Sequence, residues 1–309
     1  MALDHVNVFA LDDGDGWTIV DTGLMSKKTK AIWAALITGP LAGKPIRRLI
    51  VTHHHPDHIG LAGWFQDQGV ELITTRTAWL LARMLVLDEQ PKPTAEGLLY
   101  YRRAGLTAAE LAAKAEERPF NFADIVAPLP QGFTRIEEGS ILRAGGRRWL
   151  VRIGHGHAPD HATLWSLDDS LILGGDQLLP GISANIGVYP TEPEADPLGE
   201  WLDSTRRFEA FAQDDHLILP GHKLPFTGLP FRLVQMAENH TSALDRLLGH
   251  LKTEKTALQC FPALFKREIG PADQGLALVE AVAHLNYLLK RDLVSRFLTQ
   301  DGAWQWQAR

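Results

Sequence analysis

Residues 46–60 read IRRLIVTHHHPDHIG, and this stretch constrains the fold more than any other part of the chain. Its apolar run predicts a buried strand, and four histidines and one aspartate follow at the carboxyl end of that strand. A purification tag is excluded, because Pro56 and Asp57 break the histidine run and the run lies deep inside the chain. Two interpretations remain at this point: a metal site, or a polar loop rich in histidine.

The geometry of an extended strand end favours the metal site. Side chains alternate along a strand, so His53 and His55 point the same way and His54 points away from them. Asp57 and His58 follow after a turn and can therefore address a second centre close to the first. Imidazole and carboxylate groups are the ligands expected for zinc, iron or manganese.

Three later strand ends carry the same kinds of groups. GHGHAPDH places His157 in a glycine-flanked loop after a strand, LILGGD ends a strand with Asp176, and LILPGH ends another with His222. Glycine beside each of them permits a sharp turn. Any one of these residues alone would be read as part of an ordinary loop, but their order together is hard to read that way. His155 is a neighbouring alternative to His157.

This order of motifs, T-H-x-H-x-D-H, then G-H, G-D and P-G-H, resembles the metallo-β-lactamase superfamily, and so does the early IVDTG with Asp21 and Gly23. The likeness covers about residues 3–230. It implies an α/β fold, an αββα sandwich with a dinuclear site at one edge. The implied branch is that of the glyoxalase-II-like and thioesterase-like hydrolases, with a winged-helix-like C-terminal extension.

The resemblance also implies two divalent metal ions, with zinc expected and iron or manganese as alternatives. The implied ligands all follow predicted strands: His53, His55, Asp57, His58, His157, Asp176 and His222. Within this set, His53, His55 and His157 belong to one ion, Asp176 bridges both, and the remaining three belong to the other.

Further residues are expected to support these ligands. His161, four positions after His157, and Asp21 are expected to hold ligands in place by hydrogen bonds. Asp57 is expected to have a catalytic role as well, because its second carboxylate oxygen can carry a proton. His54 is expected to be a spacer.

Hydrolysis of an ester, thioester or lactone by a hydroxide shared between two ions is the function that this resemblance implies. The bridging Asp176 argues against antibiotic hydrolysis, and Gln177 stands near where lactonases of this superfamily carry tyrosine. A mononuclear iron enzyme that oxidises a persulfide, an oxidoreductase of the dioxygenase class, is the alternative. A phosphodiesterase or nuclease is the weaker third reading.

The remaining patterns divide the 309 residues into two regions. A catalytic domain is predicted at 1–230, with strands on both sides of a helical insertion at about 77–120. The insertion and the segment 180–201 are expected to wall the pocket, with Trp79, Tyr100, Tyr101 and Tyr189 as candidates to line it. The region 231–309 is predicted as two amphipathic helices and a hairpin that turns at Asp301-Gly302.

Composition limits the classes of binding partner and the cellular compartment that are expected. The net charge of −6 and the nearly balanced charge of the C-terminal region argue against nucleic acid, so that region is expected to serve packing or a homodimer. Cys260 is the single cysteine, which fits a reducing compartment. The start of the chain lacks the features of a secretory signal, and no apolar run is long enough for a membrane span. We therefore expect a cytoplasmic enzyme with a small-molecule substrate.

Overall fold

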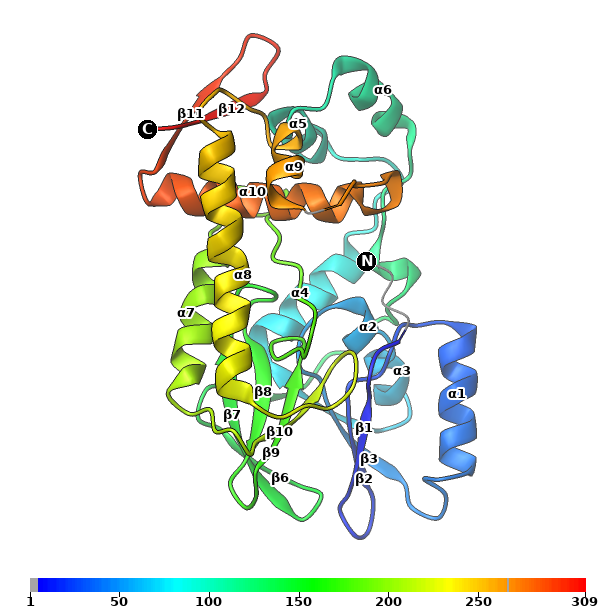
Figure 1. Cartoon of the computed structure of the whole chain (residues 1–309). Coiled ribbons are helices and arrows are strands. Elements are labelled where there is room, and N and C mark those ends of the chain that lie inside the picture. The colour runs from blue at the N-terminus through cyan, green and yellow to red at the C-terminus, as the bar shows by residue number, and fades with distance from the viewer. Residues whose placement is uncertain (1–4, 266) are drawn as a thin grey trace.

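The computed structural model describes residues 5–265 and 267–309. Two five-stranded sheets lie face to face and helices cover their outer faces, which confirms the αββα sandwich (Figure 1). Between the sheets, Ile50 and Ile73 of the first sheet belong to one hydrophobic cluster with Trp149 and Leu164 of the second. Burial of this shared apolar surface is what holds the two sheets together.

The first sheet has the strand order β1-β2-β3-β4-β5, and the second has the order β10-β9-β8-β7-β6. The strands of the first sheet are β1 (Phe9–Asp12), β2 (Trp17–Val20), β3 (Ile46–Ile50), β4 (Glu71–Thr75) and β5 (Thr134–Ile136). Those of the second are β6 (Ile141–Ala144), β7 (Arg147–Gly154), β8 (His161–Ser166), β9 (Leu171–Gly175) and β10 (Leu217–Pro220). The strand pairs β1-β2, β6-β7 and β8-β9 are antiparallel hairpins.

Strand direction gathers the motif residues at one edge of the sandwich. In the first sheet, β2 to β5 run parallel, so the segments after β2 and β3 leave the sheet on the same side. In the second sheet, β8 is antiparallel to β7 and β9, and β10 is parallel to β9. The carboxyl ends of β7, β9 and β10 therefore meet at one edge as well.

The helices form the two outer layers. On the first sheet lie α1 (Lys27–Thr38), α2 (Pro56–Ile59), α3 (Ala62–Gln66) and α4 (Arg76–Leu87). Ser26 caps α1, since its hydroxyl accepts a 3.0 Å hydrogen bond from the backbone N–H of Thr29. On the second sheet lie α7 (Pro197–Glu209) and the first half of α8 (Leu229–His250), where Phe208 and Leu233 pack against Trp165.

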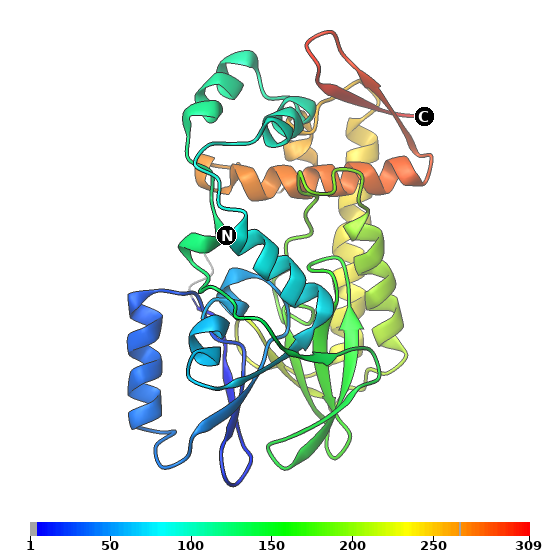
Figure 2. The ribbon, with the colours of Figure 1, turned by 180° about the vertical axis from the view of Figure 1, so that it is seen from behind.

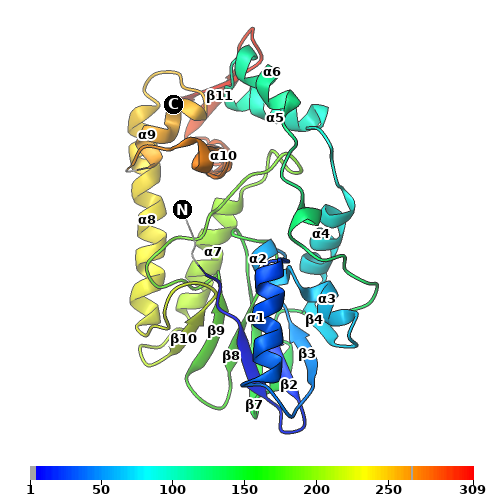
Figure 3. The ribbon, with the colours of Figure 1, turned by 90° about the vertical axis from the view of Figure 1, so that its right-hand side faces the viewer.

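The helical insertion is confirmed, but its helices serve two different parts of the molecule. It contains α4, α5 (Ala95–Ala104), α6 (Ala108–Glu116) and the short η1 (Phe122–Asp124). Ala82 of α4 packs into the core of the first sheet, whereas Tyr100 and Ala104 of α5 pack into the core of the C-terminal region. Figure 3 shows this division, with α4 beside the sandwich and α5 and α6 next to β11.

The C-terminal region contains helices and the predicted hairpin. Its elements after α8 are η2 (Leu258–Cys260), α9 (Phe261–Leu264), η3 (Pro271–Asp273), α10 (Gln274–Lys290), β11 (Val294–Leu298) and β12 (Trp304–Ala308). In Figures 1 and 2, α10 lies across one end of the sandwich. Trp201 of α7 shares a cluster with Leu247, Leu285 and Trp306, so apolar packing is continuous from the sandwich into this region. The boundary at residue 230 stays a prediction.

The prediction for the segment 180–201 was incomplete, because helix α7 begins inside it. Asp196 caps this helix and Pro197 occupies its first turn, a favourable start that the preceding proline-rich loop disguises. Leu198, Trp201 and Leu202 then bury one face of the helix. Within the described ranges, no helix is long and apolar enough to span a membrane.

Candidate metal centre

The seven predicted ligands lie together at the edge where the two sheets meet. The backbone N–H of Ala162 in β8 donates a 2.8 Å hydrogen bond to the carbonyl of Thr52 after β3, which joins the sheets at this point. Three overlapping groups of side chains here place their ligand atoms within 4.8 Å of one another. These groups are His53, His55 and His157; His53, His58 and Asp176; and Asp57, His58 and His222.

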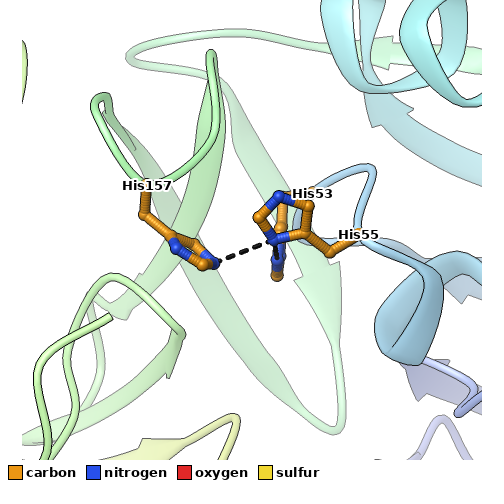
Figure 4. A group of neighbouring side chains, drawn as sticks. All are labelled: His53, His55 and His157. Atoms are coloured by element: carbon orange, nitrogen blue, oxygen red, sulfur yellow. Dashed lines mark hydrogen bonds between the residues drawn. The ribbon is translucent and has the colours of Figure 1, made fainter. Parts of the chain in front are cut away.

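The first group is a cluster of three imidazoles. Nδ1 of His55 lies 3.0 Å from Nε2 of His53 and 3.0 Å from Nε2 of His157, so three nitrogens converge on one small volume (Figure 4). His54 points elsewhere, as predicted, and its ring stacks near Phe122. His155 accepts a hydrogen bond from the backbone of Asp160, outside these groups. The geometry therefore selects His157 over His155.

The third group, Asp57, His58 and His222, contains a carboxylate and two imidazoles. Oδ2 of Asp57 lies 3.2 Å from Nε2 of His222 and 3.8 Å from Nε2 of His58. Asp57 and His58 are held in place by α2, which begins at Pro56 directly after the histidine run. This helix was not predicted, because four residues are too few to show a helical period.

Asp176 lies between the first and the third of these groups. Its Oδ1 is 3.4 Å from Nε2 of His58, and its Oδ2 is 3.3 Å from Nε2 of His222 and 3.5 Å from Nε2 of His157. One carboxylate thus contacts side chains of both groups. This is the position that a bridging ligand would occupy.

The outward ring nitrogens of four histidines are anchored by protein oxygens. Nδ1 of each lies 2.6–3.0 Å from an oxygen: His53 from Thr52 Oγ1, His58 from Asp21 Oδ2, His157 from Asn185 O and His222 from His5 O. A carbonyl or carboxylate oxygen only accepts, so Nδ1 of the last three carries the hydrogen. Anchoring of one ring nitrogen while the other faces inward is the usual arrangement around metal-binding histidines.

Several inward-facing atoms lack a protein partner. Among the described residues, Nε2 of His58, Nε2 of His222 and Oδ1 of Asp176 are buried and have no hydrogen bond. An unsatisfied buried polar atom costs about 1–3 kcal/mol, more when it is charged. Nitrogen and carboxylate donors that converge without partners fit divalent metal ions.

Charge at the site also favours a cation. Burial opposes protonation of His58, but the carboxylates of Asp176, Asp21 and Asp57 outweigh it and raise the pKa of this imidazole well above its usual range. Burial likewise opposes protonation of His222, and the nearby carboxylates of Asp176 and Asp57 raise its pKa to about 10. Three buried or half-buried carboxylates thus draw positive charge, either as protons or as metal ions.

The two predicted supporting residues lie against these ligands. Asp21 adopts a left-handed backbone conformation with φ 60°, and its carboxylate accepts hydrogen bonds from His58 and from the backbone N–H of Thr52. The ring of His161 stacks on His53 with 4.4 Å between centroids, and its Nε2 accepts the N–H of Asp176 at 3.1 Å. Burial, more than the neighbouring imidazoles, lowers the pKa of His161 to about 3, so it stays a neutral acceptor.

At two motif positions, neighbouring atoms leave no room for a side chain larger than that of glycine. A Cβ on Gly221 would lie 2.2 Å from Oδ1 of Asp176, and a Cβ on Gly175 would lie 2.5 Å from Cε1 of His161. Gly175 also has φ +49°. The glycines of LILGGD and LILPGH therefore allow the backbone to approach the side chains of the site closely.

Comparison with known protein families identifies the fold. Residues 1–222 match the protein family described as "Metallo-beta-lactamase superfamily". The chain belongs to this superfamily. Residues 244–309 match a second family, described as "Metallo-beta-lactamase-like, C-terminal domain", so the C-terminal region is also shared with relatives.

Similar proteins support a metallo-hydrolase. The chain is 26% identical over 307 residues to the "Probable metallo-hydrolase YqjP" of Bacillus subtilis, covering 96% of this chain and 91% of that protein. A beta-lactamase domain protein from Burkholderia ambifaria is 33% identical, with a TM-score of 0.88 over 100% of this chain and 88% of that one. A metallo-beta-lactamase family protein from Thermus thermophilus is 25% identical, with a TM-score of 0.81 over 100% and 95%. The protein is a metal-dependent hydrolase of the metallo-beta-lactamase superfamily.

Sequence reasoning missed some residues of this superfamily member's site. Thr52 and Asn185 orient His53 and His157 through hydrogen bonds. Thr52 opens the T-H-x-H-x-D-H motif but was given no role, and Asn185 lies outside every motif. Of the four aromatic candidates, Trp79, Tyr100 and Tyr101 pack against hydrophobic clusters. Tyr189 alone among the four is substantially exposed, at 45% of its surface.

Proposed function

We propose that this protein holds two divalent metal ions, zinc in the resting enzyme, and hydrolyses a small ester, thioester or lactone. The observation that carries the proposal is the position of Asp176, whose carboxylate contacts His157 of one ligand group and both His58 and His222 of the other. A single-ion site would need neither a second group nor a carboxylate between them.

The residues divide into two proposed ligand sets that share one carboxylate. His53, His55 and His157 would hold one ion, Asp57, His58 and His222 the other, and Asp176 both. Divalent ions bound here would polarise a substrate carbonyl and lower the pKa of a water held between them. Burial and the neighbouring imidazoles lower the pKa of His53 and His55, so both stay neutral and present a lone pair to an ion.

Asp57 is the proposed proton carrier. Its side chain is 30% exposed, whereas the side chains of Asp21 and Asp176 are 3% and 7% exposed. Of these three carboxylates, Asp57 is therefore the one that contacts proposed ligands and is also accessible to solvent. A general acid must pass its proton to the leaving group and recover one from water, and this position serves both steps.

The proposed substrate is a small molecule with an acyl group. The preference for esters, thioesters and lactones comes from the likeness of the motifs to the thioesterase-like branch. Tyr189, which is 45% exposed, lies on the loop that also carries Asn185. The chain's net charge of −6 provides no general attraction for nucleic acid, so a nuclease role is not proposed.

The first test is elemental analysis of protein purified without a chelating column. We expect about two zinc ions per chain in the wild type. His157→Ala should lose at least one ion, and His155→Ala should keep both as the matched control. Ester, thioester and lactone panels then define the reaction.

Two outcomes would overturn this proposal. About one iron per chain with little zinc would point to the oxidoreductase alternative, which oxygen uptake with a persulfide substrate would check. Failure to bind any metal after reconstitution would remove the dinuclear site.

A further inference from the structure

A loop between β9 and α7 connects the metal centre to the C-terminal region. Residues 179–196 form no helix or strand before α7 begins at Pro197. In Figure 3 the yellow-green chain that contains these residues rises from the sandwich towards α10. We call residues 179–196 the connecting loop.

The connecting loop contacts the metal centre through a backbone carbonyl. Nδ1 of His157 donates a hydrogen bond of 2.9 Å to the carbonyl oxygen of Asn185. A carbonyl oxygen accepts only, so this contact requires the hydrogen on Nδ1 and leaves Nε2 with its lone pair. Nε2 is the atom that faces His55 and Asp176. The position of one carbonyl thus sets both the tautomer and the ring orientation of His157.

Helix α10 holds the side chain of the same residue. Nδ2 of Asn185 donates to Oε2 of Glu280 at 2.9 Å and to the carbonyl of Leu276 at 3.3 Å. Leu276 and Glu280 are four positions apart, so both acceptors lie on one face of α10. Burial raises the pKa of Glu280 to about 7, and the hydrogen bond from Asn185 favours the ionised form of Glu280. A hydrogen bond to an ionised carboxylate is stronger than one between neutral groups, which makes Glu280 in that form the firmer of the two anchors.

The rest of the connecting loop is held by the same region of the chain. The N–H of Val188 donates to the carbonyl of Val279 at 3.0 Å, and Nδ2 of Asn286 donates to the carbonyls of Pro193 and Ala195. At the loop's beginning, the guanidinium of Arg232 in α8 donates to two backbone carbonyls, at 2.6 and 2.8 Å. A loop without regular structure is thus fixed along its length by α8 and α10.

We propose that Glu280 is a positioning residue for the metal centre: through Asn185 it fixes the tautomer and orientation of His157. The C-terminal region then helps to position a proposed ligand of the metal site. This inference rests on the metal-binding role proposed above for His157. It goes further by assigning a task in that site to a helix that supplies none of the proposed ligands.

The test compares three variants of the full-length protein. Glu280→Leu removes the acceptor for Asn185, and Glu280→Gln keeps an amide oxygen in its place. Leu288→Ala is the control, because Leu288 is a buried core residue of the same helix whose loss destabilises the region. It lies two helical turns beyond Glu280, away from the two acceptors that hold the Asn185 side chain.

The first readout is nitrogen NMR of metal-free protein with ¹⁵N-labelled histidine, which reports where His157 carries its hydrogen. We expect the Nδ1–H form in the wild type, Glu280→Gln and Leu288→Ala, and a mixture with the Nε2–H form in Glu280→Leu. The second readout is zinc affinity by chelator competition. We expect about a 10–100-fold loss for Glu280→Leu, within the range known for residues that support metal ligands, and near wild-type affinity for the other two.

Two results would overturn the inference. In the first, Glu280→Leu retains the wild-type tautomer and zinc affinity. In the second, Leu288→Ala loses as much affinity as Glu280→Leu, which would make the effect one of general stability. If Glu280→Leu fails to fold, Asn185→Ala carries the test, because it keeps the carbonyl and loses only the anchored side chain. The tautomer measurement needs neither metal nor substrate, so it stays decisive even if the proposed hydrolase function fails.

Discussion

Nδ1 of His58 donates a hydrogen bond of 2.8 Å to Oδ2 of Asp21, while Oδ1 of the same carboxylate accepts the backbone N–H of Thr52 at 2.9 Å. A single buried side chain thus ties α2 to the end of β3. The left-handed backbone of Asp21, at φ 60°, is unusual outside glycine and is maintained by these contacts. The carboxylate of Asp21 orients the imidazole of His58, but Asp21 itself lies outside the proposed ligand set.

Removal of this carboxylate should therefore weaken metal binding without removing a proposed ligand. For Asp21→Ala we expect about a 10–100-fold loss of zinc affinity, because His58 loses its orientation and its preferred tautomer. Chelator competition measures this loss. Asp168→Asn is the control, since Asp168 pairs with Arg148 on the surface. Equal affinities in Asp21→Ala and the wild type would show that His58 is oriented by other contacts.

Gly221→Ala should damage the site through space alone. A Cβ at this position would lie 2.2 Å from Oδ1 of Asp176, so the carboxylate has to move away from His58. We expect loss of one of the two proposed ions and at least about a 100-fold drop in turnover, comparable to the loss of one transition-state contact. Gly249→Ala in α8 is the matched control, because no atom lies within 4 Å of its Cβ. A fully active Gly221→Ala enzyme would contradict the position assigned to Asp176.

A buried histidine pair should make the stability of the C-terminal region depend on pH. Nδ1 of His240 and Nε2 of His284 are 3.3 Å apart, and burial lowers the pKa of His240 to about 3 and that of His284 to about 4. The unfolded chain takes up these protons near pH 6.5, and the folded chain does so only near the lower values. Stability is therefore complete above about pH 6.5 and falls as the pH drops towards 4, by up to about 1.4 kcal/mol per pH unit for each histidine.

His240→Phe isolates this contribution. The free energy of unfolding in urea, measured between pH 7 and pH 5, should fall less steeply in the variant than in the wild type. The absolute stability at pH 7 can change in either direction, since phenylalanine removes a hydrogen bond and adds apolar surface. The slope is the decisive quantity, and identical slopes in both proteins would refute the prediction.

Arg232 should contribute more to stability than an ordinary surface arginine. It is buried, and its guanidinium donates to the carbonyls of Leu179 and Ile182 in the connecting loop. Arg232→Met leaves both carbonyls without their charged donor, and we expect a loss of about 3 kcal/mol from the free energy of unfolding. Arg246→Met is the control, because Arg246 also donates to carbonyls but is exposed. Losses of equal size in both variants would argue against a special role for Arg232.

Much of this architecture could be predicted from local patterns. Apolar runs followed by His or Asp beside glycine placed the candidate ligands at strand ends, and the C-terminal hairpin followed from its Asp301-Gly302 turn. These features depend on neighbours within a few positions along the chain, so the sequence carries them directly.

Helix boundaries were predicted less well where local signals conflict. Helix α2 is too short to show a period, and α7 follows a proline-rich loop that hides its start. The helical insertion was recognised as helical, yet nothing in its sequence separates α4, which packs on the sandwich, from α5, which packs on the C-terminal region. Amphipathic periodicity predicts that a helix buries one face, but not which partner covers that face.

The amino-acid order alone indicated which residues are ligand candidates, in what sequence and at which strand ends. Tertiary packing established that His157 rather than His155 meets His55, that Asp176 lies between two groups, and that Asn185 and Glu280 stand behind His157. The contact from His157 to Asn185 spans 28 positions, and that from Asn185 to Glu280 spans 95. Contacts of this range arise when separate elements pack, and packing follows from the whole buried surface rather than from any local run of residues.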